Sequence, residues 1–402
     1  MFWGFGMAFH TTFAVIPLFL KKLGAPDIVV ASVAGVFVIM AAAPQILTAF
    51  VGRNIQNLKF AVISVHFLPL PPIFIAGFIF VFIGPSGPSA WMIYYFCYLL
   101  FTLGIGVVFP IWADFLETVH IPEKRGPFFG VSFAFNFLAG GLGGLIAKKL
   151  YEAIEFPANF GYGFLIYSVC IVAASLFFIP FRMKTTVRTS ESKTFKQFLS
   201  EVKKVLSDDL NFRHYIISRI FLTANYPAIA LYAVYSQEKL QLHISEAGIF
   251  TAITVITGGL SSYVTGRIGN RFGHKRAMVF VFIAYLLALV TALTAKTLTQ
   301  AYLIFFFLGM GQGGFWTTAM SLIFEFAGDR DKKIYFALTD SLTAPFVLLF
   351  IVAAGLFKPI VGIPVVLSGI GLFILIGIFS LTFLTKEPKA IRAEMRPQEP
   401  LF

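Results

Sequence analysis

Twelve long apolar segments, separated by short polar or Gly- and Pro-containing stretches, dominate this 402-residue chain. Each is close to the roughly 20 residues that a helix needs to cross the hydrocarbon core of a bilayer. Their approximate bounds are 2–20, 28–50, 60–82, 91–115, 128–150 and 162–181 and, after a polar interval, 215–235, 247–269, 277–295, 301–326, 334–357 and 361–384. We therefore predict an all-α integral membrane protein with twelve transmembrane helices.

The composition excludes a soluble fold. Apolar residues make up 58% of the chain and charged residues only 12%, too few polar groups to cover a water-exposed surface. The two cysteines, Cys97 and Cys170, lie in apolar segments, which excludes a disulfide framework and a cysteine metal site. We expect neither a metal nor a cofactor.

Basic residues are distributed unequally between alternate loops. If successive loops lie on opposite sides, 24 of the 31 Lys and Arg residues fall on the side of both termini and 7 on the other. Cytoplasmic loops collect Lys and Arg, so we place both termini in the cytoplasm and the protein in the inner membrane of a bacterium. The same distribution accounts for the net charge of +12 without nucleic acid as a partner. The first segment has neither the basic flank nor the cleavage site of a signal peptide, so we take it as a true span.

The polar interval in the middle of the chain divides it into domains. We expect a first six-helix bundle at 1–181, a cytoplasmic loop at 182–212, a second bundle at 213–385 and a cytoplasmic tail at 386–402. Within the loop, Thr194 and Gln197 have the spacing of a capping box, and apolar residues follow at helical spacing among lysines. This pattern predicts an amphipathic helix at the lipid headgroups, and a linker helix without membrane contact is the alternative.

Short motifs recur between the two sets of six segments at nearly one spacing. Ala34–Phe37 and Gly52-Arg53 correspond to Ala247–Phe250 and Gly266-Arg267, Leu103–Gly106 to Leu308–Gly311, and Glu123–Arg125 to Asp331–Lys333, at offsets between 205 and 214. Such a repeat predicts two pseudo-symmetric six-helix bundles in the same membrane orientation. That symmetry favours a solute site between the bundles that opens alternately to each side, which predicts a transporter.

A glycine- and arginine-rich loop follows the eighth span. In Gly266-Arg267-Ile268-Gly269-Asn270-Arg271-Phe272-Gly273-His274-Lys275-Arg276, Gly266 permits close helix approach and Gly273 allows a tight turn. The basic residues hold the loop at the headgroups, and a turn that only fixes topology is the alternative.

This loop resembles the signature of the major facilitator superfamily, which reads Gly, three residues, Asp, Arg, one residue, Gly, one residue and two basic residues. Five positions match, namely Gly266, Arg271, Gly273, Lys275 and Arg276, while Asn270 stands where the family usually has Asp. The corresponding loop of the first half keeps Gly52 and Arg53 but lacks the acid. The resemblance implies the major facilitator fold, and the missing acids imply a weaker cytoplasmic contact between the halves.

Polar residues inside spans are candidates for the solute pathway because they are expensive there. In the resembled family, spans one, four, seven and ten, with two, five, eight and eleven, surround the cavity. Residues on these spans that we expect to contact solute are His10, Asn136, Asn225, Tyr232, Gln312 and Trp316. His10 and Asp340 are the candidates for ion coupling. Hydrogen bonding between helices without solute contact is the alternative for each.

We conclude from the sequence that the chain is a secondary active, proton-coupled transporter of a small organic solute, acting by alternating access as a monomer. The expected pathway is aromatic and neutral-polar, which favours an uncharged or amphiphilic solute. A drug or metabolite efflux carrier is the alternative within transport, and a transport-inactive membrane sensor is a remote one. An enzyme is not expected, since nothing brings candidate acids and bases within hydrogen-bond reach.

Overall fold

The computed structural model describes residues 1–44, 48, 55, 57–119, 125–180, 195–328, 330 and 332–388. In this part of the chain every regular element is a helix, which confirms the all-α prediction. The first half contributes α1 (Phe2–Met7), α2 (Val15–Lys22), α3 (Asp27–Ala42), α5 (Leu58–His66), α6 (Leu70–Phe78), α7 (Pro88–Val119), α8 (Arg125–Ala153) and α9 (Ala158–Leu176). After α10 (Phe195–Asp208), the second half contributes α11 (Leu210–Leu222), α12 (Asn225–Leu240), α13 (Glu246–Phe272), α14 (His274–Thr294), α15 (Leu298–Ala327) and α16 (Lys332–Phe379).

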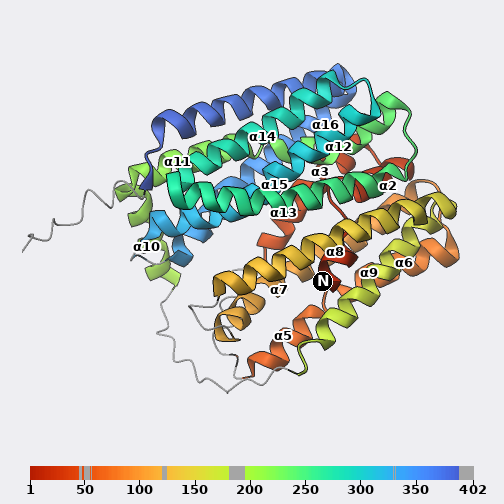
Figure 1. Cartoon of the computed structure of the whole chain (residues 1–402), viewed down its shortest axis with the longest axis horizontal. Helices are drawn as coiled ribbons and strands as arrows, with labels where there is room; N and C mark the ends of the chain where they lie inside the picture. Colours follow the sequence, from red (N-terminus) through yellow and green to blue (C-terminus); the bar gives the residue numbers. More distant parts are fainter. Residues whose placement is uncertain are drawn as a thin grey trace, which may run out of the picture.

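The long helices run side by side along the molecule (Figure 1). One end carries the last residues of α2 and the first of α3, and we call it the α2 end. The opposite end carries α10, and we call it the α10 end.

Seven described segments are long and apolar enough to cross a bilayer. One of them, Leu338–Leu384, has 47 residues, which at about 1.5 Å per residue suffices for two crossings. Large apolar side chains cover the outside of the helices, and Phe82, Leu138 and Ile360 are 66%, 66% and 76% exposed. This surface needs lipid around it, and the arrangement fits the twelve predicted crossings.

The first predicted span is not one helix. Helix α1 ends at Met7, α2 begins at Val15, and the chain between them turns irregularly. The Oγ1 of Thr11 accepts a hydrogen bond from the amide of Val15 at 3.0 Å, and the carbonyl of Thr11 accepts one from Ile16. A Thr side chain that bonds to nearby backbone in this way competes with the regular helix, which explains the break.

Prolines and a glycine bend two further spans. The third span is kinked, since α5 ends at His66 and α6 begins at Leu70 with prolines in its first turn. A π-helical turn, Ile79–Ile83, completes this span. In the last segment, α16 continues from the eleventh span into the twelfth through Gly362, whose φ of +79° suits glycine alone.

The two halves pack through glycines near the α2 end. Helix α8 lies against α13, and α3 lies against α16. A Cβ on Gly144 would lie 2.6 Å from the carbonyl oxygen of Gly248, so α8 and α13 touch backbone to backbone there. Likewise, a Cβ on Gly355 of α16 would lie 2.5 Å from the side chain of Ile28 in α3. Any larger residue at these positions would separate the halves.

A second glycine-rich seam joins α13 to α15 inside the second half. The hydroxyl of Ser261 donates to the carbonyl of Met310 at 2.7 Å, and that of Ser262 donates to Gly313 at 2.8 Å. These bonds require close backbones, which the glycines around Gln312 permit. This part of the repeat is therefore a packing surface.

Helix α10 is attached to the second half. It contacts α11 and α16, and its Val205 is buried in the main hydrophobic core. The predicted cap residue Thr194 lies outside the described residues. A helix is present where the amphipathic pattern predicted one, and its contact with lipid headgroups stays a prediction.

Candidate functional site

Two breaks lie at corresponding places in the two halves. The first span is interrupted between α1 and α2, and the seventh between α11 and α12 at Thr223 and Ala224. Paired interruptions of this kind mark the solute site in many membrane carriers, because unwound backbone and nearby polar side chains face the pathway there. His10 lies in the first break and Asn225 directly after the second.

His10 lies inside the first half, within a box of aromatic rings. Only 6% of it is exposed, and its Nε2 has no hydrogen-bond partner among the described residues. The ring of Phe101 is closest, with centroids 4.7 Å apart. The other rings of the box, 5.5 to 6.2 Å away, belong to Tyr94, Tyr98, Phe164 and Tyr167. All five come from α7 and α9, so His10 faces the interior of its own bundle.

Asn225 and Tyr232 lie buried on α12 without partners. Asn225 is 2% exposed, and neither atom of its amide forms a hydrogen bond within the described structure. The hydroxyl of Tyr232 is likewise unpaired. Each such buried group costs about 1–3 kcal/mol if it stays unsatisfied, so water or solute is expected to satisfy it. Both residues therefore remain candidates for contact with the solute.

The remaining candidates do not converge on these residues. Trp316 is 63% exposed and contacts Phe315 edge-on at 6.3 Å. Gln312 and Asn136 are half-buried, and Asn136 packs against Gly4 of α1. The described hydrogen bond between halves nearest the first break joins the hydroxyls of Thr11 and Thr251 at 3.2 Å. Neither threonine was among the sequence candidates.

A buried cation lies in the second half, on α11. Arg219 is 7% exposed, and its Nη1 donates to the hydroxyl of Tyr215 at 3.2 Å. Its guanidinium carbon lies 4.4 Å from the ring centre of Phe315. Asp340 of α16 interacts with it electrostatically and is exposed, yet no ion pair joins the two in the described structure. Arg219 stands near the start of its span, where a long basic side chain can reach the headgroups, but the helix turns it inward.

Charged residues join the two halves at the α2 end, in what we call the Asp27 cluster. Asp27 of α3 forms an ion pair with Lys358 of α16, whose side chain is buried, and another with Lys21 at 3.4 Å. Lys21 also pairs with Glu238 of α12 at 3.0 Å. The cluster thus ties spans one and two to spans seven and eleven.

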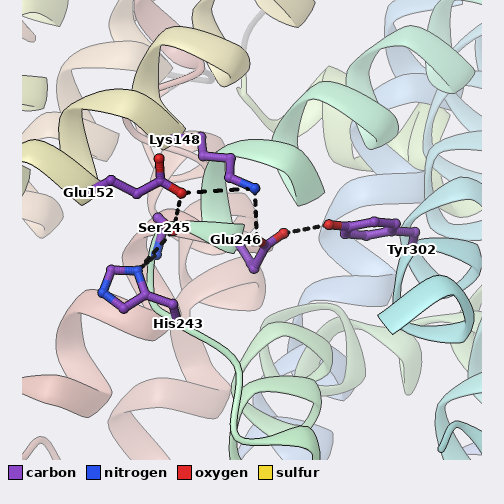
Figure 2. Close-up of polar contacts among 6 residues, drawn as sticks. All are labelled: Lys148, Glu152, His243, Ser245, Glu246 and Tyr302. Carbon is purple, nitrogen blue, oxygen red and sulfur yellow. Dashed lines mark hydrogen bonds and ion pairs between the residues drawn. The ribbon is translucent and has the colours of Figure 1, made fainter. Parts of the chain in front are cut away.

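A second group, the Glu246 cluster, ties α8 to α13 at the same end (Figure 2). Lys148 of α8 donates to Glu246 of α13 at 2.8 Å, and Glu246 accepts a further bond from the hydroxyl of Tyr302 at 2.7 Å. Beside them, Ser245 donates to Glu152 of α8 at 3.2 Å and contacts the Nδ1 of His243 at 2.9 Å. Every described side-chain hydrogen bond or ion pair between the halves lies in these clusters or at Thr11.

None of the residues in these two clusters was predicted from the sequence as a functional residue. Lys21, Lys148 and Lys358 belong to the basic minority on the side with few positive charges. Acids at the ends of spans in the opposite half indicate possible partners for these lysines. The sequence alone does not show which acid pairs with which lysine.

The signature loop lies at the α10 end. Gly273 has a φ of +99°, which confirms the tight turn, and Glu387 accepts a hydrogen bond from the amide of Lys275 at 3.1 Å. Burial raises the pKa of the Glu387 carboxyl, and the neighbouring Glu325 adds to the rise. At Gly266, however, an added Cβ would meet only a methyl of Thr317 at 3.6 Å, so the close approach expected there is not present. Gly52 and Arg53 lie outside the described residues.

The fold and these features define an all-helical membrane transport protein. The sequence profile described as Major Facilitator Superfamily matches residues 118–329 and 215–401. The chain therefore belongs to the major facilitator superfamily. No curated protein sequence matches it.

Solved structures of transporters have the same fold. A variant of the nucleoside transporter NupG aligns with a TM-score of 0.72 and 12% identity, over 96% of this chain and 98% of that one. A bacterial homologue of the human lysosomal transporter Spinster, inward-facing and occupied, gives 0.69 and 12% over 100% and 97%. A POT family transporter in complex with 5-aminolevulinic acid gives 0.66 and 13% over 96% of each chain. At 12% to 13% sequence identity, these matches establish that the chain shares the fold, and nothing further.

Proposed function

We propose that this protein is a secondary active transporter that moves a small organic solute by alternating access. The observation that carries the proposal is the pair of ion-pair clusters, Asp27 and Glu246, which bind the two halves to each other at one end. Such carriers open alternately to each side of the membrane by breaking contacts between two rigid bundles at one end and forming them at the other. Polar contacts that form and break cost less than reorganising a packed apolar core.

We infer a state that is closed at the α2 end, where both ion-pair clusters lie, and open toward the α10 end. Asp340 stands between the start of α16 at the α10 end and the middle of the molecule, and its side chain is exposed although it interacts with buried Arg219. We take this exposure to face the pathway from the α10 end, because no described side-chain hydrogen bond or ion pair joins the halves there. The aligned Spinster homologue is inward-facing in its two structures, which supports the same state here if the α10 end is cytoplasmic.

The charge distribution between loops supports that orientation. We place the α10 end, both termini and residues 182–212 in the cytoplasm, with bundles at 1–181 and 213–385 and a tail at 386–402, in the inner membrane of a bacterium. The protein acts as a monomer, because both bundles of the pathway belong to one chain.

We assign proton coupling to Asp340. An exposed carboxylate that interacts with a buried cation affects that cation strongly when it gains or loses a proton. His10, by contrast, is enclosed by neutral rings and contacts no acid in the described structure. We infer that His10 stays neutral and supports the first break.

Transport is tested by counterflow in proteoliposomes loaded in turn with sugars, nucleosides, amino acids, organic acids and cationic dyes. The proposal predicts saturable exchange of a labelled solute, and its dependence on the direction of a pH gradient separates uptake from efflux. A solute that raises the melting temperature but never exchanges would instead indicate a sensor. The double variant Asp27→Asn with Glu246→Gln should change the exchange rate. Glu155→Gln, which changes an exposed acid of the first half outside both clusters, should not.

A further inference from the structure

Arg219 is a buried guanidinium without a charged partner in contact. A guanidinium has five N–H donors, and in the described structure only one bond is formed, to the neutral hydroxyl of Tyr215. Burying a charge in this way is costly unless an opposite charge or water compensates it. Asp340 is close enough to interact electrostatically but forms no ion pair with it. The unpaired donors thus leave room for an acceptor that the chain itself does not supply.

The surroundings of Arg219 specify what that acceptor is. The guanidinium lies 4.4 Å from the ring centre of Phe315, and its carbon lies 5.9 Å from that of Tyr215. A guanidinium stacked on aromatic rings keeps its N–H edges free, and these match the two oxygens of a carboxylate. Tyr226 and Tyr285 also lie near the cation. An apolar body next to the carboxylate therefore finds aromatic neighbours.

From this geometry we propose that Arg219 binds the carboxylate of an amphiphilic organic monoanion, which is the solute class that this transporter carries. The inference rests on the proposed transport function, and it narrows the expected uncharged or amphiphilic solute to a charged amphiphile. A single negative charge is specified because no second basic residue interacts with Arg219 or Asp340 in the described structure. A phosphate dianion would bring a second negative charge that no further basic residue compensates.

Asp340 gives this site its link to protons. Arg219 and ionised Asp340 together carry no net charge, so a bound carboxylate would leave the site with one negative charge in excess. A proton on Asp340 restores neutrality, and solute anion and proton are then bound together. The other titratable groups that face the pair are the tyrosines Tyr215, Tyr226 and Tyr285, which stay neutral near pH 7. Asp340 therefore competes with the solute when it is ionised.

The test uses benzoate, with benzamide as its neutral match, on the full-length protein in detergent. Unfolding is followed by a thiol-reactive dye, since both free cysteines are buried in the folded state. Benzoate should raise the melting temperature of the wild type and benzamide should not. Arg219→Gln should weaken benzoate binding about tenfold to a hundredfold, the loss expected for hydrogen bonds to a charged group. Arg219→Lys should retain part of the affinity, and Arg213→Gln, an exposed arginine of the same helix, should behave as wild type.

Asp340→Asn provides a second readout that a structural role for the pair does not produce. It should strengthen benzoate binding about tenfold at pH 7.5 and make the affinity nearly independent of pH. If Arg219 and Asp340 have only a structural role, Asp340→Asn should lower the stability of the protein without raising its affinity for benzoate. This comparison remains informative if Arg219→Gln does not fold.

The proposal is overturned if benzoate, phenylacetate and hexanoate stabilise the wild type no more than their amides do. It is also overturned if Arg219→Gln binds benzoate normally, or if chloride displaces benzoate at equal concentration. If one of these results is found but another solute shows counterflow, the protein is a transporter and the carboxylate site is rejected. If benzoate binds through Arg219 but no solute shows counterflow, the carboxylate site is supported and the transport function is rejected.

Discussion

At the residue scale, Asp340 and His10 make different predictions for proton coupling. Asp340→Asn should lose accumulation driven by a pH gradient while counterflow persists, because Asn fixes the neutral state that binds solute. His10→Gln should accumulate solute within about threefold of wild type, since its aromatic box contains no charged partner. Uptake into proteoliposomes with and without an imposed gradient measures both. Loss of gradient-driven accumulation in His10→Gln alone would move coupling to the first break.

Gly273 carries the second prediction at this scale. Its φ of +99° and ψ of 142° belong to a region that costs other residues about 1–3 kcal/mol, and an added Cβ would meet the carboxylate of Glu387. Gly273→Ala should therefore lower the melting temperature. Gly369→Ala is the control, because a Cβ there meets nothing within 4 Å and its helical backbone favours Ala. Equal melting temperatures for the two variants would show that the signature turn is not strained.

At the element scale, two glycines of α13 should behave differently. Gly248 faces α8, where a Cβ would meet the backbone of Gly144 and Lys148, so Gly248→Leu should separate the halves and lower stability. Gly266→Leu should leave the melting temperature unchanged, since only Thr317 is near. Gly266→Leu should nevertheless slow transport, because the signature loop has to approach its partner when the α10 end closes. Wild-type flux in Gly266→Leu, measured at equal protein content, would reduce this loop to a topological role.

The elements show which features follow from sequence. Apolar length predicted the spans and the internal repeat predicted the two related halves, because both follow from local composition and motifs. The break around Thr11 did not follow, since a Thr that caps locally and one that continues a helix look alike in sequence. The Asp27 and Glu246 clusters, and the inward turn of Arg219, depend on how distant helices pack. Charge patterns of single loops do not contain that information.

At the scale of the whole molecule, membrane orientation is the first prediction. A cysteine replacing Ser86, exposed near the α2 end, should react with a membrane-impermeant thiol reagent added to intact cells. A cysteine replacing Ser207 on α10 should react only after permeabilisation. The buried Cys97 and Cys170 should contribute little background. Reaction of the Ser207 position in intact cells would invert the topology and place the ion-pair clusters inside.

The central claim is that the two halves alternate about clusters that close one end. Distances between spin labels test it without knowledge of the solute, using Ser86 with Lys296 at the α2 end and Phe60 with Lys386 at the α10 end, all exposed. We predict that Asp27→Asn with Glu246→Gln lengthens the α2-end distance and shortens the α10-end distance relative to wild type, whereas Glu155→Gln changes neither. Two distances that stay fixed, or that lengthen together, would contradict alternating access in this protein.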